Sequence, residues 1–223
     1  MIKGIIFDFD GLILDTETRQ YLVLQDIFAE HGSELPIVRW QKEIGTKTGF
    51  SVFHYLEEKL ERKIEHQLLE EQFKKRFHAS LAMEKIRPGV ENYLEAAKGL
   101  GLKIGLASSS NFQWVSSHLK NLGIFEYFEC IRTSDDVEKV KPDPSLYLKA
   151  AKCLGLTADE VLIFEDSANG ALAAKKAGMS CVIVPNEVTD TMDFCKVEHR
   201  LSSMTDMTLE DVISLVNKNR ILM

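Results

Sequence analysis

Two aspartates lie two positions apart at the end of the first apolar run of this 223-residue sequence, in Asp8-Phe9-Asp10-Gly11. Residues two apart in an extended chain point the same way, so both carboxylates can face one site. Two acids that close repel each other and need a cation or a shared proton. A hard divalent ion such as Mg²⁺, which takes oxygen ligands, meets that need. Taken alone, such a pair is more typical of a strand that ends in a solvated acidic turn.

Polar residues also follow two other apolar runs. Ser108 comes directly after Lys103–Ala107, and Glu165 and Asp166 come directly after Val161–Phe164. Open parallel sheets bind ligands at the carboxyl ends of their strands. We therefore expect the hydroxyl and these acids to gather with Asp8 and Asp10 at one edge of a sheet.

The sequence contains further groups suited to phosphate. Helix starts near Asn111 and Ser167 would add backbone N–H groups that favour a bound phosphate. Lys141 precedes Pro142, which favours an extended loop. Acids with a metal, a hydroxyl, a lysine and backbone donors are the groups that phosphoryl transfer requires.

The elements that must position these residues alternate between strands and helices. The apolar runs do not alternate with polar residues, which is typical of strands buried on both faces of a parallel sheet. Helical stretches with recognisable caps separate them. The expected strands are Ile2–Phe7, Lys103–Ala107, Phe128–Arg132 (the weakest), Val161–Phe164 and Cys181–Val184, and the expected helices are Asn111 to Leu122, Asp143 to before Gly155, and Ser167 to Ala177. This order predicts an α/β, Rossmann-like, doubly wound domain.

Residues 16–87 break this rhythm, because they contain no convincing strand but several helical patterns. Apolar residues at a four-residue spacing predict a buried helix face at Leu69, Phe73, Phe77 and Leu81. The segment ends at Arg87-Pro88-Gly89, a turn signal that could serve as a hinge. We predict a catalytic core formed by residues 1–15 and 88–223, with an inserted helical cap at 16–87.

Composition excludes several other classes of protein. The net charge of −7 argues against a nucleic-acid surface, and no apolar run approaches the ~18 residues that span a membrane. The first residues lack the features of a signal peptide, so a cytoplasmic location is expected. The four cysteines include no Cys-x-x-Cys pair, which predicts structural thiols rather than a zinc site or disulfides. The six histidines show no recognisable ligand spacing and are interpreted as surface or core residues.

The run from Asp8 to Thr16, DFDGLILDT, resembles the first motif of the haloacid dehalogenase superfamily of phosphotransferases. Ser108 resembles the second motif, Lys141 the third, and Glu165-Asp166 the fourth. The four motifs occur in order at separations similar to those of the family, and the helical insertion is similar to the cap of its β-phosphoglucomutase-like branch. The resemblance therefore extends over the whole core.

This resemblance implies a phosphatase that acts on a small phosphorylated metabolite. Asp8 would be the nucleophile that forms an aspartyl-phosphate, and Asp10 would be the general acid and base. Mg²⁺ would be held by the Asp8 carboxylate, the Asp10 backbone carbonyl and Asp166, with Glu165 in or beside its ligand shell. The implied phosphate-binding residues are Ser108, Lys141, Ser109 and Asn111, although Asn111 is also needed as a helix cap.

Two other functions are open to the sequence. The related β-phosphoglucomutases carry a histidine and an arginine in the cap, where this chain has Gln20 and Thr48. Gln cannot exchange a proton near neutral pH as His can, and the guanidinium fork is absent, so the mutase is the second candidate. A silent sensor of phosphorylated metabolites would be expected to have lost Asp8, Asp10 or Asp166. Dehalogenation is disfavoured, because the halide-releasing members lack the second acid of the first motif, which Asp10 supplies here.

Overall fold

A six-stranded parallel sheet forms the centre of a computed structural model that describes residues 1–221. The strand order is β3-β2-β1-β4-β5-β6, which places β1 between β2 and β4. This arrangement confirms the predicted doubly wound α/β fold. The strands are β1 Gly4–Phe7, β2 Lys103–Ala107, β3 Cys130–Arg132, β4 Val161–Glu165, β5 Ser180–Ile183 and β6 His199–Arg200.

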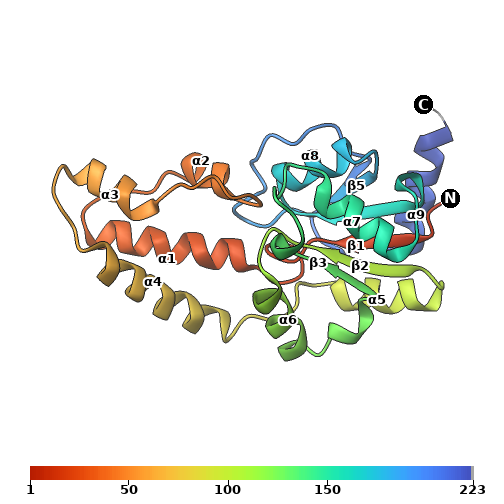
Figure 1. The fold of residues 1–223 in the computed structure, drawn as a ribbon, viewed down its shortest axis with the longest axis horizontal. Helices are drawn as coiled ribbons and strands as arrows, with labels where there is room; N and C mark the ends of the chain where they lie inside the picture. The colour runs from red at the N-terminus through yellow and green to blue at the C-terminus, as the bar shows by residue number, and fades with distance from the viewer. Residues whose placement is uncertain (222–223) are drawn as a thin grey trace.

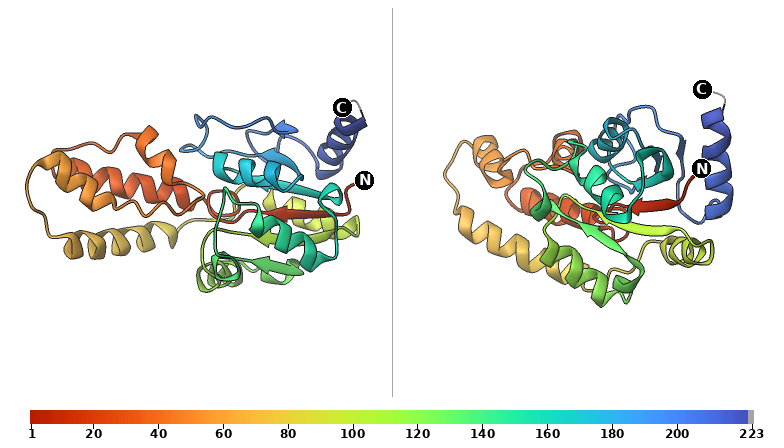
Figure 2. Two further views of the ribbon diagram at one scale, coloured as in Figure 1. Left: turned by 45° about the horizontal axis from the view of Figure 1, so that its top comes forward. Right: turned by 45° about the vertical axis from the view of Figure 1, so that its right-hand side comes forward.

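Helices cover both faces of the sheet (Figures 1 and 2). Ile5 and Phe7 of β1 pack into the apolar core beneath α5, α6 and α9, whereas Ile6 packs into the core beneath α7 and α8. Alternate side chains of a strand point to opposite faces, so β1 needs apolar residues at every position. The helices are α5 Val90–Gly99, α6 Phe112–Asn121, α7 Ser145–Leu154, α8 Ala168–Lys176 and α9 Leu209–Ile221, with short 3₁₀ turns at Phe125–Tyr127, Ser134–Asp136 and Ala158–Glu160.

A helical segment extends away from the carboxyl end of the sheet (Figure 1). It contains a separate apolar cluster, which includes Leu24, Phe28 and Leu56 together with Val188 of the sheet domain. The predicted buried face of α4 contributes to two apolar clusters. Leu69 packs inside the helical segment, whereas Phe77 and Leu81 pack against the sheet domain. The segment consists of α1 Thr16–Glu30, α2 Ile37–Trp40, a 3₁₀ turn at Gln41–Glu43, α3 Val52–Leu60 and α4 His66–Leu81.

The two chain crossings between the sheet and the helical segment lie side by side. Leu14 and Ile86 form an antiparallel bridge, and the Arg87 N–H donates to the Ile13 carbonyl at 2.9 Å. The Arg87 guanidinium also donates to the carbonyls of Gly11 (2.6 Å), Val184 (3.0 Å) and Pro185 (2.7 Å). Arg87 therefore holds the second crossing against the edge of the sheet.

One prediction about the cysteines is wrong. Cys130 of β3 and Cys153 of α7 form a disulfide with a Cα–Cα distance of 6.2 Å. The pairing depends on how α7 packs against β3, which the spacing of cysteines along the chain does not show. Cys181 and Cys195 are free, and Cys181 is buried as predicted.

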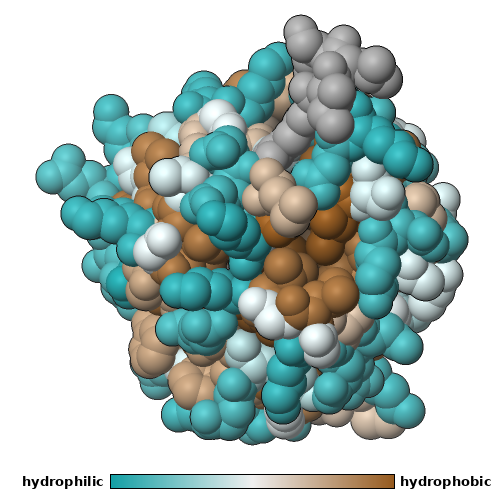
Figure 3. All heavy atoms as spheres, turned by 90° about the vertical axis from the view of Figure 1, so that its right-hand side faces the viewer, coloured by the Kyte–Doolittle hydropathy of each residue, from teal (hydrophilic) through white to brown (hydrophobic). Residues whose placement is uncertain are grey.

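The end of the molecule opposite the helical segment carries hydrophobic side chains in two groups separated by hydrophilic ones (Figure 3). This face lies at the amino ends of the strands, away from the polar residues that follow them, so it takes no part in the candidate site. Among residues 1–221, no helix is both long enough and apolar enough to cross a membrane.

Candidate active site

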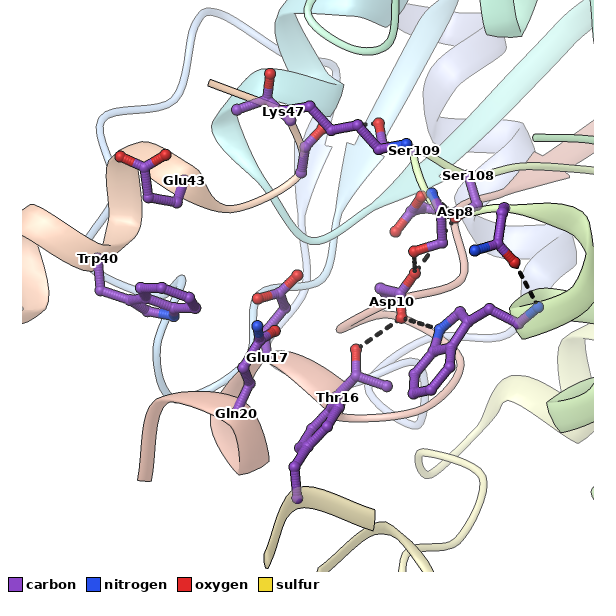
Figure 4. A pocket seen from close by; sticks show the side chains of 16 residues that line it. Asp8, Asp10, Thr16, Glu17, Gln20, Trp40, Glu43, Lys47, Ser108 and Ser109 are labelled. Atoms are coloured by element: carbon purple, nitrogen blue, oxygen red, sulfur yellow. Dashed lines mark hydrogen bonds between the residues drawn. The ribbon is translucent and has the colours of Figure 1, made fainter. Parts of the chain in front are cut away.

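The predicted polar residues lie at the carboxyl ends of the central strands, along one edge of the sheet. Phe7 is in register with Leu106 of β2 and Phe164 of β4, so Asp8 emerges beside the ends of both neighbouring strands. A cavity of about 390 Å³ opens there between the sheet and the helical segment (Figure 4). Its lining residues are Asp8, Asp10, Thr16, Glu17, Gln20, Trp40, Glu43, Gly45, Thr46, Lys47, Phe77, Ser108, Ser109, Ser110, Asn111 and Trp114.

Asp8 and Lys141 form a buried ion pair. The Lys141 ammonium contacts Asp8 Oδ1 and donates to Glu165 Oε1 at 2.7 Å. Burial raises the pKa of Asp8 to about 8, against the lowering effect of the Lys141 charge. Burial by itself would lower the pKa of Lys141, but the charges of Asp8 and Glu165 raise it above its ordinary value. The lysine is therefore a fixed cation beside the Asp8 carboxylate.

Protein donors occupy both oxygens of Glu165. Oε1 accepts from Lys141 and from the Tyr147 hydroxyl (2.9 Å). Oε2 accepts from the backbone N–H groups of Asp166 and Ser167, both at 2.8 Å, and from the Ser167 hydroxyl at 3.0 Å. Burial opposes ionisation of Glu165, but Lys141 and these donors hold its pKa below the ordinary value. Glu165 thus anchors Lys141 to the start of α8.

Asp166 is the third buried carboxylate of this edge. One oxygen each of Asp8, Glu165 and Asp166 lies within 4.8 Å of the other two. Asp166 Oδ2 accepts from the Asn186 amide at 2.8 Å. Burial raises the pKa of Asp166 well above its ordinary value, and the charges of Glu165 and Asp8 raise it further. A divalent cation with oxygen ligands would offset this concentration of negative charge, so the residues present fit Mg²⁺.

The close approach of Gly11 to Asp166 explains why the acidic motif ends in glycine. Gly11 has a positive φ of 82°, which side chains other than glycine rarely adopt. A Cβ at this position would collide with the Asp166 carboxylate. The turn after Asp10 therefore brings the backbone directly against the predicted metal ligand.

Four side chains hold the Asp10 carboxylate in place. Oδ1 accepts from the Thr16 hydroxyl at 3.0 Å and from the Trp114 indole N–H at 2.9 Å. Oδ2 accepts from the hydroxyls of Ser110 at 2.6 Å and Ser108 at 3.3 Å. These donors come from the start of α1, from the loop after β2 and from α6, so Asp10 has a defined orientation toward the cavity (Figure 4).

The residues predicted to bind phosphate have different environments. Ser108 is buried next to Asp10 and also accepts from the Ser110 N–H at 3.0 Å. Asn111 lines the cavity and caps α6, because its Oδ1 accepts from the Trp114 N–H at 2.8 Å. The Ser109 hydroxyl donates instead to the Gly45 carbonyl of the helical segment, at 2.9 Å.

Further hydrogen bonds join residues 41–45 of the helical segment to the sheet domain. The Asn169 amide of α8 donates to the Ile44 carbonyl at 2.7 Å, next to the bond from Ser109 to Gly45. The Gln41 amide donates to the Val188 carbonyl at 2.7 Å and to the Thr191 hydroxyl at 2.8 Å. Residues 41–45 are therefore held to the sheet domain by four hydrogen bonds.

Sequence reasoning missed Trp114, Ser110 and Asn186. Asn186 follows the expected strand Cys181–Val184, so the rule of polar residues at strand ends could have found it. Ser110 lies within a run of three serines and has no distinguishing signal. Trp114 lies in the first turn of α6, and only the direction of its side chain brings the indole to Asp10.

The helical segment supplies the opposite wall of the cavity. Glu17 and Gln20 of α1 face the region in front of Asp8 and Asp10, and the Lys47 side chain extends toward Ser109 (Figure 4). Burial raises the pKa of Glu17 well above its ordinary value, as do the charges of Asp10 and Asp8. Thr48 does not line the cavity, and its hydroxyl donates to Glu43.

Comparison with known proteins identifies relatives over the whole length of the chain. A family model described as "Haloacid dehalogenase-like hydrolase" matches residues 5–184. "Putative phosphatase YhcW" of Bacillus subtilis (strain 168) is 59% identical over 217 residues, covering 97% of this chain and 99% of the relative. "Phosphorylated carbohydrates phosphatase" of Thermotoga maritima is 31% identical over 185 residues, covering 80% of this chain and 82% of the relative.

Solved structures share the fold. A β-phosphoglucomutase from Clostridium difficile superposes with a TM-score of 0.76 and 24% identity, covering 99% of this chain and all of the other. At that level of identity the likeness concerns the fold alone.

Proposed function

The chain belongs to the haloacid dehalogenase-like hydrolase family and is a phosphatase, and from this premise we propose that it hydrolyses a small phosphorylated metabolite with Asp8 as the nucleophile. The observation that carries the proposal is the position of the Asp8 carboxylate. It lies at the end of the central strand, beside Lys141, and opens onto the cavity that Asp10 also lines.

The reaction proceeds in two displacements. An Asp8 oxygen attacks phosphorus, the bond from phosphorus to the leaving oxygen breaks, and Asp10 gives that oxygen a proton. Asp10 then takes a proton from water, which attacks the aspartyl-phosphate, releases inorganic phosphate and restores the Asp8 carboxylate. The four hydrogen bonds to Asp10 keep its carboxyl group aimed at the same place in both steps.

Lys141 and Ser108 neutralise and orient the phosphoryl oxygens. The ion pair between Lys141 and Asp8 holds the ammonium where the negative charge of the phosphoryl group arrives. Asp8, Asp166 and the backbone carbonyl of Asp10 would hold Mg²⁺, which when bound neutralises phosphoryl charge. We assign Glu165 the role of positioning Lys141, since five protein donors already occupy its oxygens.

Residues 16–87 act as a cap that selects the substrate. The hydrogen bonds of residues 41–45 support this role, because they hold Gly45, which lines the cavity, against the sheet domain. Glu17, Gln20 and Lys47 offer polar contacts to the part of the substrate beyond the phosphate. Hydroxyl groups of a sugar phosphate fit such a wall, and the relative from Thermotoga maritima bears the name of a phosphatase of phosphorylated carbohydrates.

The test is phosphate release from a panel of sugar phosphates, with Asp8→Asn compared with Asp15→Asn. Asp15 caps α1 by accepting from the Thr18 N–H at 3.1 Å, and asparagine caps equally well. We expect Asp8→Asn to lose activity down to background and Asp15→Asn to keep it. Activity of folded Asp8→Asn near the wild-type rate would rule out Asp8 as the nucleophile. The absence of turnover by the wild type on any phosphate ester would favour a sensor.

A further inference from the structure

A cluster of two histidines and one glutamate lies in the helical segment, outside the candidate active site. His54 and Glu57 lie one turn apart on α3, and His66 is the first residue of α4. One ligand atom of each lies within 4.8 Å of the other two. We call these three residues the cap-tip cluster. The eleven residues between His54 and His66 in the sequence conceal this proximity, which arises because the chain folds back between α3 and α4.

Glu57 is already fixed at the centre of the cap-tip cluster. Its Oε2 accepts from the Ile64 N–H at 3.3 Å and lies 3.0 Å from His66 Nε2, while Lys63 contacts Oε1 at 2.7 Å. Carboxylates are ionised at neutral pH, and these contacts hold that of Glu57 in one orientation. A metal ligand must be deprotonated and oriented, and Glu57 meets both conditions.

We propose that His54, Glu57 and His66 bind one Zn²⁺ ion at the tip of the helical segment. Two imidazole nitrogens and one carboxylate oxygen form a ligand set that zinc favours, with water in the fourth position. Zinc–ligand bonds of about 2.0–2.1 Å put tetrahedral ligand atoms about 3.4 Å apart. The contact between Glu57 and His66 is close to this spacing, and the ring centroids of His54 and His66 lie 6.1 Å apart.

The neighbouring charges do not block the cap-tip cluster. Lys63 is 93% exposed, and exposed ion pairs contribute little to stability, so a divalent ion can displace the lysine. Glu58 lies 3.5 Å from His54 Nε2 through a side chain that is 64% exposed. A zinc ion would join α3 to α4 across residues 61–65 and stabilise the end of the helical segment farthest from the sheet (Figure 1).

Zinc binding can be measured on the full-length protein by calorimetric titration with ZnCl₂ in excess Mg²⁺. The variant Asp166→Asn serves as the background, because it weakens the separate acidic site next to Asp8. We expect one Zn²⁺ per chain in this background. Adding His54→Ala or His66→Ala should weaken binding by more than the 10- to 100-fold that loss of an outer-shell partner costs, taken as an order-of-magnitude guide.

Glu57→Gln and Glu58→Gln form a matched pair for the third ligand. Both change one glutamate on α3, so we expect Glu57→Gln to weaken zinc binding strongly and Glu58→Gln to preserve it. Zinc should also raise the Tm of the background protein, but not that of the protein with His54→Ala, an exposed position whose change leaves the fold intact. Unchanged zinc affinity in His54→Ala and His66→Ala, or the reverse order of the two glutamine variants, would overturn the proposal.

Discussion

The indole N–H of Trp114 donates a hydrogen bond of 2.9 Å to the carboxylate of Asp10. The same indole ring stacks on Phe77 of α4, with ring centroids 6.0 Å apart and an angle of 16° between the planes. The residue proposed as the general acid is therefore oriented by a side chain that also contacts the helical segment. A displacement of α4 would be transmitted to Asp10 through this ring.

Trp114→Phe should lower kcat by about 10- to 100-fold and change KM little. A hydrogen bond to a charged group contributes about 1.5–3 kcal/mol, and the donors Thr16, Ser110 and Ser108 would remain on Asp10. Trp40→Phe is the matched control, because the buried Trp40 N–H has no hydrogen-bond partner among the described residues. Steady-state kinetics of both variants decides the matter. Equal losses of kcat would show that ring size, and not the hydrogen bond, is responsible.

Removal of divalent metal with EDTA should abolish phosphate release, and added Mg²⁺ should restore it. Ca²⁺ should restore it poorly, since Ca²⁺ takes more ligands at longer distances and would misplace the attacking carboxylate. Asp166→Asn should require a higher Mg²⁺ concentration, because it removes a charged ligand beside Asp8. Activity titrated against each metal provides the measurement. Full activity of the wild type in excess EDTA would contradict a metal-dependent mechanism.

Hydrolysis should prevail over migration of phosphate within a sugar. A mutase must keep water from the aspartyl-phosphate and activate a sugar hydroxyl. The cavity offers Gln20 where the related mutases have a histidine, and Thr48 is directed to Glu43. With β-glucose 1-phosphate and a trace of the 1,6-bisphosphate, we expect free phosphate or no reaction. Gln20→His alone should not create an efficient mutase.

If glucose 6-phosphate accumulated faster than free phosphate, the protein would be a phosphomutase rather than a phosphatase. Both products can be followed in the same reaction, so the two activities are compared under identical conditions.

The pH dependence of stability should report on Glu17. Because its pKa in the folded protein lies well above the ordinary 4.5, the folded state binds this proton more tightly than the unfolded chain. The stability that this proton provides is complete below 4.5 and is lost as the pH rises through the raised pKa. In metal-free protein, Glu17→Gln should therefore reduce the fall in Tm between about pH 5 and pH 8.

Glu34→Gln, at an exposed position of the same segment, should follow the wild type. Parallel curves for wild type and Glu17→Gln would contradict the prediction.

The sheet was predictable because its central strands are buried on both faces. β1, β2 and β4 are continuous apolar runs, and a residue directly after such a run must lie at the edge of the sheet. The same reasoning brings Asp8, Ser108 and Asp166 together. It misses β6, which consists of His199 and Arg200 at the edge of the sheet and carries no apolar signal.

Contacts made by side chains across elements were not predictable from the sequence. The pairing of Cys130 with Cys153 depends on the packing of α7 on β3. The hydrogen bond from Ser109 to Gly45 depends on where the helical segment lies over the sheet. The sequence therefore predicted Ser109 only as a phosphate-binding residue. The boundaries of a separate cap at residues 16 and 87 stay a prediction.

The bridge between Leu14 and Ile86 has a consequence for how such proteins diversify. Bridged residues on antiparallel chains lie about 5 Å apart, so the chain leaves the sheet and returns to it at nearly the same point. Any helical unit whose two ends meet could be spliced in at this point without moving Asp8 or Lys141. Substrate preference could then change by exchange of a module, while the groups that act on phosphorus keep their places.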